Sequence, residues 1–176
     1  MNARYSNARA TPSGNREDLY RIRLVHNQRP GFLHTMMYSR DIDLHPLRGE
    51  TLSTVLRYRI NKAINSQIHT TVSISKTKDE FLRFSGYEES SQLNGYVYYR
   101  PTSKTDFIYH VLRRESTTTA TALNDLTTWN HTFIYRRQFD NDWRVNGSFS
   151  SLKRISDVAN DSFVENVWRI DFYRRF

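Results

Sequence analysis

The sequence contains no cysteine, which excludes disulfide bonds, thiolate metal sites and a cysteine nucleophile. Long apolar runs are absent too: no stretch approaches the roughly 18 consecutive apolar residues of a transmembrane helix. The opening segment MNARYSNARATPSGNRED is polar and is not a signal peptide. We therefore expect either a cytosolic protein or a mature form or fragment of a longer one.

Motifs for catalysis and metal binding are also scarce. The six histidines (His26, His34, His45, His69, His110 and His131) show no zinc-type spacing with another ligand. No glycine-rich phosphate loop and no serine nucleophile motif are present. We predict neither a metal nor a cofactor, and we do not expect an enzyme.

The composition favours β-structure. Of 176 residues, 38% are hydrophobic and 14% are aromatic, with 11 Tyr and 10 Phe. A polar chain rich in tyrosine, phenylalanine, threonine and valine favours strands. The length predicts one domain over residues 1–176. The net charge of +8 suggests anionic partners without choosing among them.

Apolar and polar residues alternate along much of the chain, which is the signal of two-faced strands. Ile68, Val72 and Ile74, for example, alternate with His69 and Ser73. No segment shows a sustained helical period, and we interpret TALNDLTT near residue 124 as a loop. The pattern predicts ten strands, at residues 2–9, 18–27, 31–41, 51–61, 66–76, 91–101, 105–115, 127–138, 141–152 and 164–176.

The predicted connections are of two kinds. Between Tyr99 and Phe107, and between Tyr135 and Trp143, seven mostly polar residues form a turn flanked by aromatic residues. The connections on the other side, such as RDIDLHPLRGE and SKTKDEFLRFSGYEES, are longer and more varied. An even number of antiparallel strands places both chain ends on the short-turn side.

This pattern resembles that of Gram-negative outer-membrane β-barrels. The closing VENVWRIDFYRRF is similar to the carboxy-terminal assembly signal of that family, which has a terminal aromatic residue and apolar residues at alternate positions before it. Trp168, Ile170, Phe172 and Phe176 match that signal, and Arg174 departs from it. The hairpins YYRPTSKTDF and YRRQFDNDW resemble those of large porin-like barrels that export exopolysaccharide or sheath multihaem cytochromes.

The resemblance implies an all-β, antiparallel, up-and-down transmembrane β-barrel in the outer membrane. The ten strands would close alone or form the carboxy-terminal segment of a larger barrel. The implied partners are outer-membrane lipid and lipopolysaccharide, the barrel assembly machinery and a periplasmic or sheathed protein.

Strand parity assigns residues to the two faces of such a wall. The outward face is expected to carry interface girdles of aromatic residues at Tyr58, Tyr99, Phe107, Tyr135 and Trp143 beside the short turns, and at Trp129 and Trp168 near the far ends. The inward face is expected to carry Arg21, Arg23, Arg57, Arg59, Arg100, Arg136, Arg144, Arg169 and Arg175, with Asp171 as the only carboxylate in the well-phased strands.

The predicted function is a passive, porin-like conduit for anionic or polar solutes, since a cationic wall concentrates anions. Equally, the arginines could brace the sheet by hydrogen bonds across it. A barrel that sheaths a partner and conducts nothing fits the same pattern.

Two further classes stay open. Outer-membrane lipases place a catalytic histidine on the outer wall, and His131 lies outward between Trp129 and Phe133; an interfacial histidine explains this position better. A soluble basic β-protein that binds nucleic acid would stack bases on aromatic residues beside cations. Such residues are interleaved at Tyr96, Tyr98, Tyr99, Arg100 and Lys104, but aromatic residues recur beside successive turns, which disfavours one local platform.

Overall fold

The computed structural model describes residues 2–10, 17–45, 49–82, 85–119, 125–139, 142–158 and 160–174. These residues form ten strands and no helix. The strands are β1 (Asn2–Ala10), β2 (Glu17–Arg29), β3 (Phe32–His45), β4 (Gly49–Ala63), β5 (Ile68–Phe81), β6 (Tyr87–Thr102), β7 (Thr105–Thr118), β8 (Leu126–Gln138), β9 (Trp143–Ser156) and β10 (Phe163–Arg174).

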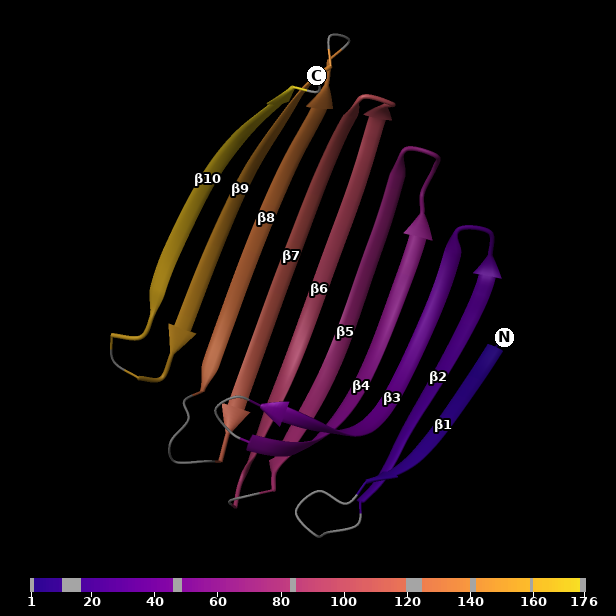
Figure 1. Ribbon diagram of the computed structural model, residues 1–176, viewed down its shortest axis with the longest axis vertical. Helices are drawn as coiled ribbons and strands as arrows, with labels where there is room; N and C mark the ends of the chain where they lie inside the picture. Colours follow the sequence, from indigo (N-terminus) through magenta and orange to yellow (C-terminus); the bar gives the residue numbers. More distant parts are fainter. Residues whose placement is uncertain are drawn as a thin grey trace.

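All ten strands lie in one antiparallel sheet in sequence order, from β1 to β10 (Figure 1). The predicted number of strands, their order and their up-and-down pairing are confirmed. Closure into a barrel is not seen, because β1 pairs with β2 and β10 pairs with β9 at two separate edges of an open sheet.

The strands are longer than predicted on the side of the long loops. β3 continues to His45, β5 continues to Phe81 and β6 begins at Tyr87. Much of RDIDLHPLRGE and SKTKDEFLRFSGYEES is therefore strand rather than loop. The prediction ended these strands where alternation stops, but backbone pairing continues through polar residues, since it needs no apolar side chain.

Local backbone preferences explain the short turns. Pro30 and Gly31 connect β2 to β3, where the ladder shifts register between Asn27 and Arg29. In the β4–β5 turn, the side-chain oxygen of Asn65 accepts hydrogen bonds from the amides of Gln67 and Ile68, each 2.8 Å long. Asparagine is favoured at such positions because its side chain can satisfy turn amides locally.

The sheet has little dry core. The buried residues are Ser39, Thr51, Leu52, Ser53, Ser75, Phe81, Glu88, Ile108 and Ser116. Most are polar and lie at the long-loop ends of β3–β7, and none of the described large side chains is fully buried. Both faces of the sheet are therefore available to surroundings outside the described chain.

Candidate functional site

The strand pairing sorts the predicted residues onto two opposite faces. We call one the arginine face, defined by Arg21, Arg23, Arg57, Arg59, Arg100, Arg136, Arg144 and Arg169 on β2, β4, β6, β8, β9 and β10. We call the other the aromatic face, defined by Tyr58, Tyr99, Phe107, Trp129, Tyr135, Trp143 and Trp168. Each set lies on one face because paired residues share a side of the sheet and neighbours along a strand do not. The predicted Arg175 and Phe176 lie outside the described residues.

The aromatic face exposes large apolar side chains across the whole sheet. Met36, Ile74 and Phe133 are 46%, 58% and 42% exposed, and Trp168 on the edge strand is 77% exposed. Ile170 and Phe172 continue this surface along β10. Contiguous exposed apolar surface of this kind is unusual on soluble monomers and typically marks a contact surface.

Residues that pair with one another from strand to strand form a register row across the sheet. The exposed apolar residues of the aromatic face form a belt, and this belt crosses the register rows at an angle. The row through Ile22, Tyr38 and Leu56 is apolar on β2–β4, then becomes polar at Lys76, Ser91, Glu115 and Thr127 on β5–β8. At the opposite end, the row through Thr105 and Arg137 becomes apolar only at Val145 and Phe172.

The short turns shift in the same direction as the belt. The row that ends the β2–β3 hairpin at Phe32 reaches Phe133 on β8, and β8 continues beyond this point to Gln138. Belt and turns therefore run parallel to each other and at an angle to the rows. This stagger is the geometry of strands that tilt relative to a common plane.

Three of the predicted girdle residues are neighbours. Phe107 lies between Tyr99 and Tyr135, with ring centroids 5.9 Å and 5.2 Å away. Tyr58 lies deeper in its strand, and Trp143 opens β9 at the turn. Trp129 lies toward the long-loop end of β8, but Trp168 does not match it: Trp168 pairs with Phe149 in the middle of β10. The far-girdle assignment of Trp168 stays a prediction, because the apolar belt is oblique to the register rows and a mid-strand position alone does not set the level of a residue.

Histidines on the aromatic face have hydrogen-bond partners. Nδ1 of His131 lies 2.8 Å from the hydroxyl of Tyr109, and its ring stacks on Trp129. Nδ1 of His34 lies 2.6 Å from the hydroxyl of Tyr58 in the same way. Each imidazole therefore has one nitrogen paired with a phenol, which suits a half-apolar surface.

The arginine face carries more carboxylates than predicted. Asp171 accepts hydrogen bonds from Nε of Arg169 at 2.9 Å, but Asp41 also pairs with Arg21 at 3.2 Å and Asp106 pairs with Arg100 at 2.6 Å. The prediction missed Asp41 and Asp106 because β3 and β7 carry apolar residues on both faces. Alternation therefore cannot assign the residues of these two strands to one face or the other.

The prediction also missed cations on this face. Arg4, Arg114 and Arg154 lie in the same register row as Arg23 and Arg57. Arg114 contacts Glu88 at 3.5 Å and Arg154 contacts Asp161 at 2.6 Å. Arg154 lies beyond the predicted end of its strand at residue 152, and Arg114 lies in a strand whose alternation does not separate two faces, so pairing was needed to place both residues.

Other arginines on this face have no carboxylate partner within the part of the chain that the structure describes. Arg23, Arg57 and Arg59 on β2 and β4 are among them, and so are Arg136 and Arg144 on β8 and β9. Guanidinium groups without such partners must stay hydrated or meet an anion. This part of the arginine face is thus suited to contact water.

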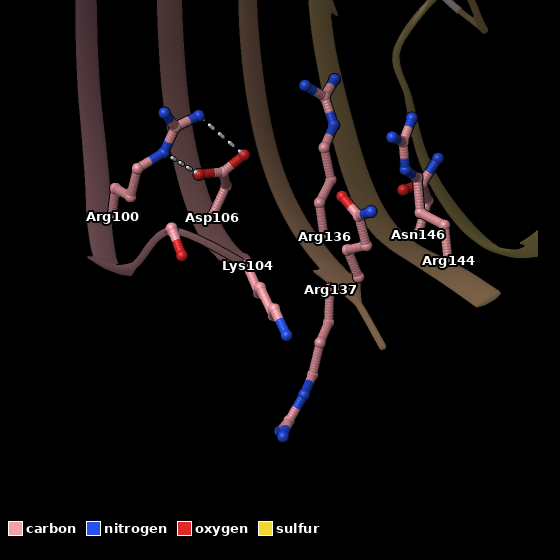
Figure 2. Close-up of a pocket in the computed structure, with 9 residues that line it drawn as sticks. Arg100, Lys104, Asp106, Arg136, Arg137, Arg144 and Asn146 are labelled. Atoms are coloured by element: carbon pink, nitrogen blue, oxygen red, sulfur yellow. Dashed lines mark hydrogen bonds and ion pairs between the residues drawn. The ribbon is translucent and has the colours of Figure 1, made fainter. Parts of the chain in front are cut away.

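A cavity of about 340 Å³ opens at the short-turn end of the arginine face (Figure 2). Its lining consists of Arg100, Ser103, Lys104, Asp106, Arg136, Arg137, Gln138, Arg144 and Asn146, from β6 to β9. Arg100 and Asp106 point toward each other, and Arg136 and Arg137 extend in opposite directions (Figure 2). Five of the nine lining residues are cationic and one is a carboxylate.

The residues of the predicted nucleic-acid platform are divided between the faces. Tyr99 lies on the aromatic face, whereas Tyr96 and Tyr98 lie on the arginine face. The guanidinium of Arg100 lies over the Tyr98 ring, 5.3 Å from its centroid, and the Tyr98 hydroxyl donates to Asp106 at 2.8 Å. A continuous stacking surface for bases is not assembled by these residues.

Within the described ranges, no three histidine or acidic side chains lie together as a metal site. No helix of the described residues could cross a membrane. The chain matches no protein-family model, and no curated protein is significantly similar to it.

Proposed function

We propose that this chain forms the wall of an outer-membrane β-barrel that acts as a porin-like conduit for anionic or polar solutes. The aromatic face contacts lipid and the arginine face lines a water-filled lumen. A spanning sheet must pair every strand, so β1 and β10 join each other or further strands in the functional state.

The observation that carries this proposal is the oblique apolar belt. A soluble two-layer protein also has an apolar sheet face. A belt that is bounded by polar residues on its central strands and runs parallel to the line of turns is what a flat membrane requires of tilted strands. The aromatic cluster of Tyr99, Phe107 and Tyr135 lies on the turn side of this belt, where interface aromatics occur.

A second candidate is a barrel that sheaths a partner protein, such as export machinery or a multihaem cytochrome. The observation that favours it is the group formed by Arg23, Arg57 and Arg59, which could pair with acidic groups of an enclosed protein. Conductance in a planar bilayer separates the two candidates. A conduit conducts when refolded alone, whereas a barrel that closes only around its partner protein does not conduct without that partner.

The test begins with refolding the chain in detergent and comparing boiled and unboiled samples on an SDS gel. A compact, heat-modifiable band with β-type circular dichroism supports a closed barrel. The next step is conductance in a planar bilayer.

The contrary outcomes are distinct. A chain that stays soluble and monodisperse without detergent contradicts the membrane proposal and favours a soluble basic protein, whose nucleic-acid binding would weaken steeply with salt. A β-rich product that pairs through its edges would show that these strands close only with additional strands.

A further inference from the structure

Charge is unbalanced in the cavity between β6 and β9. Asp106 is its only carboxylate, and Arg100 already holds it: Nε and Nη2 of Arg100 donate to the two oxygens at 2.6 Å and 3.3 Å. The Tyr98 hydroxyl donates to the same carboxylate. Asp106 thus already accepts three hydrogen bonds, and it also faces Arg136, its register partner on β8. One carboxylate cannot balance the five cations of the lining.

Arg136 and Arg144 carry the excess charge. Neither has an ion-pair partner among the residues that the structure describes. Arg136 pairs in register with Asn146 and Arg144 pairs with Gln138, so the two arginines are diagonal neighbours on β8 and β9. Like charges on diagonal neighbours repel each other, and an anion bound between them would relieve the repulsion.

The donors around this space suit an oxyanion. A guanidinium presents a planar fork of N–H groups that matches the oxygens of phosphate, and the amides of Gln138 and Asn146 add neutral donors to the lining. We propose that this cavity binds a phosphate group, free or carried on a sugar-sized solute. Its volume of about 340 Å³ exceeds the needs of a bare ion and falls in the range of small-molecule sites.

The position of the cavity points to a ligand from solution. Arg100, Arg136 and Arg144 lie on the face opposite Tyr99 and Tyr135. A lipid headgroup would approach from the aromatic face, where Arg137 is the only arginine of the lining. The inference rests on the part of the proposed function that keeps the arginine face in water, and not on lipid contact by the other face.

The test is calorimetric titration of the full chain, refolded in detergent micelles, at constant ionic strength. The probes are inorganic phosphate, glucose 6-phosphate and glucose. We expect both phosphates to bind and glucose not to bind. Phosphatidylglycerol added to the micelles tests whether the phosphate group comes from a lipid headgroup. We expect this lipid not to compete with inorganic phosphate for the cavity.

Variants locate the site. R136Q/R144Q should weaken phosphate binding at least tenfold, whereas the matched control R57Q/R59Q removes the same charge from the same face and should change it less than twofold. R136K/R144K retains the charge but loses the forks, and should give an intermediate loss. D106N removes the competing carboxylate and should strengthen binding about threefold, as expected for one charge at short range in a wet site.

Equal losses of phosphate affinity in R136Q/R144Q and R57Q/R59Q would overturn the site. They would show that phosphate is attracted by the overall positive charge of the arginine face and not by one cavity. Wild-type binding that does not distinguish glucose 6-phosphate from glucose would also overturn the site. Circular dichroism and the heat-modifiable band, taken on the same samples, report folding. A heat-modifiable barrel without phosphate binding overturns the site alone, whereas phosphate binding by a chain soluble without detergent overturns the membrane proposal alone.

Discussion

Gly31 adopts a left-handed backbone conformation, with φ of 77°, in the turn between β2 and β3. Its carbonyl accepts a hydrogen bond of 2.7 Å from the amide of Ala63, which ties this turn to the end of β4. A Cβ atom added at Gly31 would lie 3.0 Å from Cβ of Ala63. Conformation and space therefore both require glycine here.

We predict that G31A lowers the free energy of unfolding by about 1–2 kcal/mol, from the left-handed backbone and the tight contact together. Gly147 is the matched control, because a Cβ added there meets no atom within 4 Å. G147A should instead raise the stability by about 0.5–1 kcal/mol, because a glycine inside a strand loses more backbone entropy on folding than an alanine. The measurement is urea unfolding of the refolded chain, followed by tryptophan fluorescence. Equal effects of the two substitutions would contradict this account of the turn.

At the scale of the strands, the register row of Leu56 separates two kinds of environment. Leu56 on β4 is 44% exposed and lies within the apolar belt. Ser91 on β6 belongs to the same row and the same face but lies among polar residues, beside Lys76 and Glu115. If the belt follows a membrane plane across tilted strands, these two positions have different surroundings.

We predict that L56R destabilises the protein folded in lipid vesicles by about 2 kcal/mol, because a lipid-facing arginine is costly. S91R introduces the same side chain in the same row and should cost less than about 0.5 kcal/mol. The measurement is reversible unfolding from vesicles. Equal costs would show that the belt follows the rows and that the strands are not tilted in a membrane.

At the scale of the whole molecule, the charged residues behind the net charge of +8 differ between the two faces of the sheet. The arginine face gathers many of the cations toward one side, whereas Lys76 and Lys78 on the aromatic face are held by Glu89 and Glu80 at 3.1 Å and 2.9 Å. A cationic face that lined an aqueous lumen would raise the local concentration of anions, and salt would screen this effect.

We therefore predict that a pore formed by this chain prefers chloride over potassium, and that the preference declines as salt rises from 0.1 M to 1 M. Reversal potentials across a salt gradient measure it. R57Q/R59Q should reduce the anion preference, and K76Q/K78Q, which removes the same charge from the aromatic face, should not. A preference for cations would eliminate the cationic lumen.

The resemblance to outer-membrane barrels implied the up-and-down order of the strands. Alternation predicted the all-β class, the ten strands and a shared face for the predicted arginines that the structure describes. It could do so because the side-chain period of two is local: each strand reports its own two faces without knowledge of its neighbours. The same locality explains the errors. Asp41 and Asp106 were missed where both faces of a strand are apolar.

Cross-strand register is a property of pairs of strands, so only the tertiary structure decided what depends on it. It placed Arg136 and Arg144 beside Asn146 and Gln138 in one cavity, bound Asp106 to Arg100, and made the belt oblique. It also left β1 and β10 as open edges. The physical reason is that backbone hydrogen bonds between strands, rather than side-chain periodicity within one, set which residues lie at the same level.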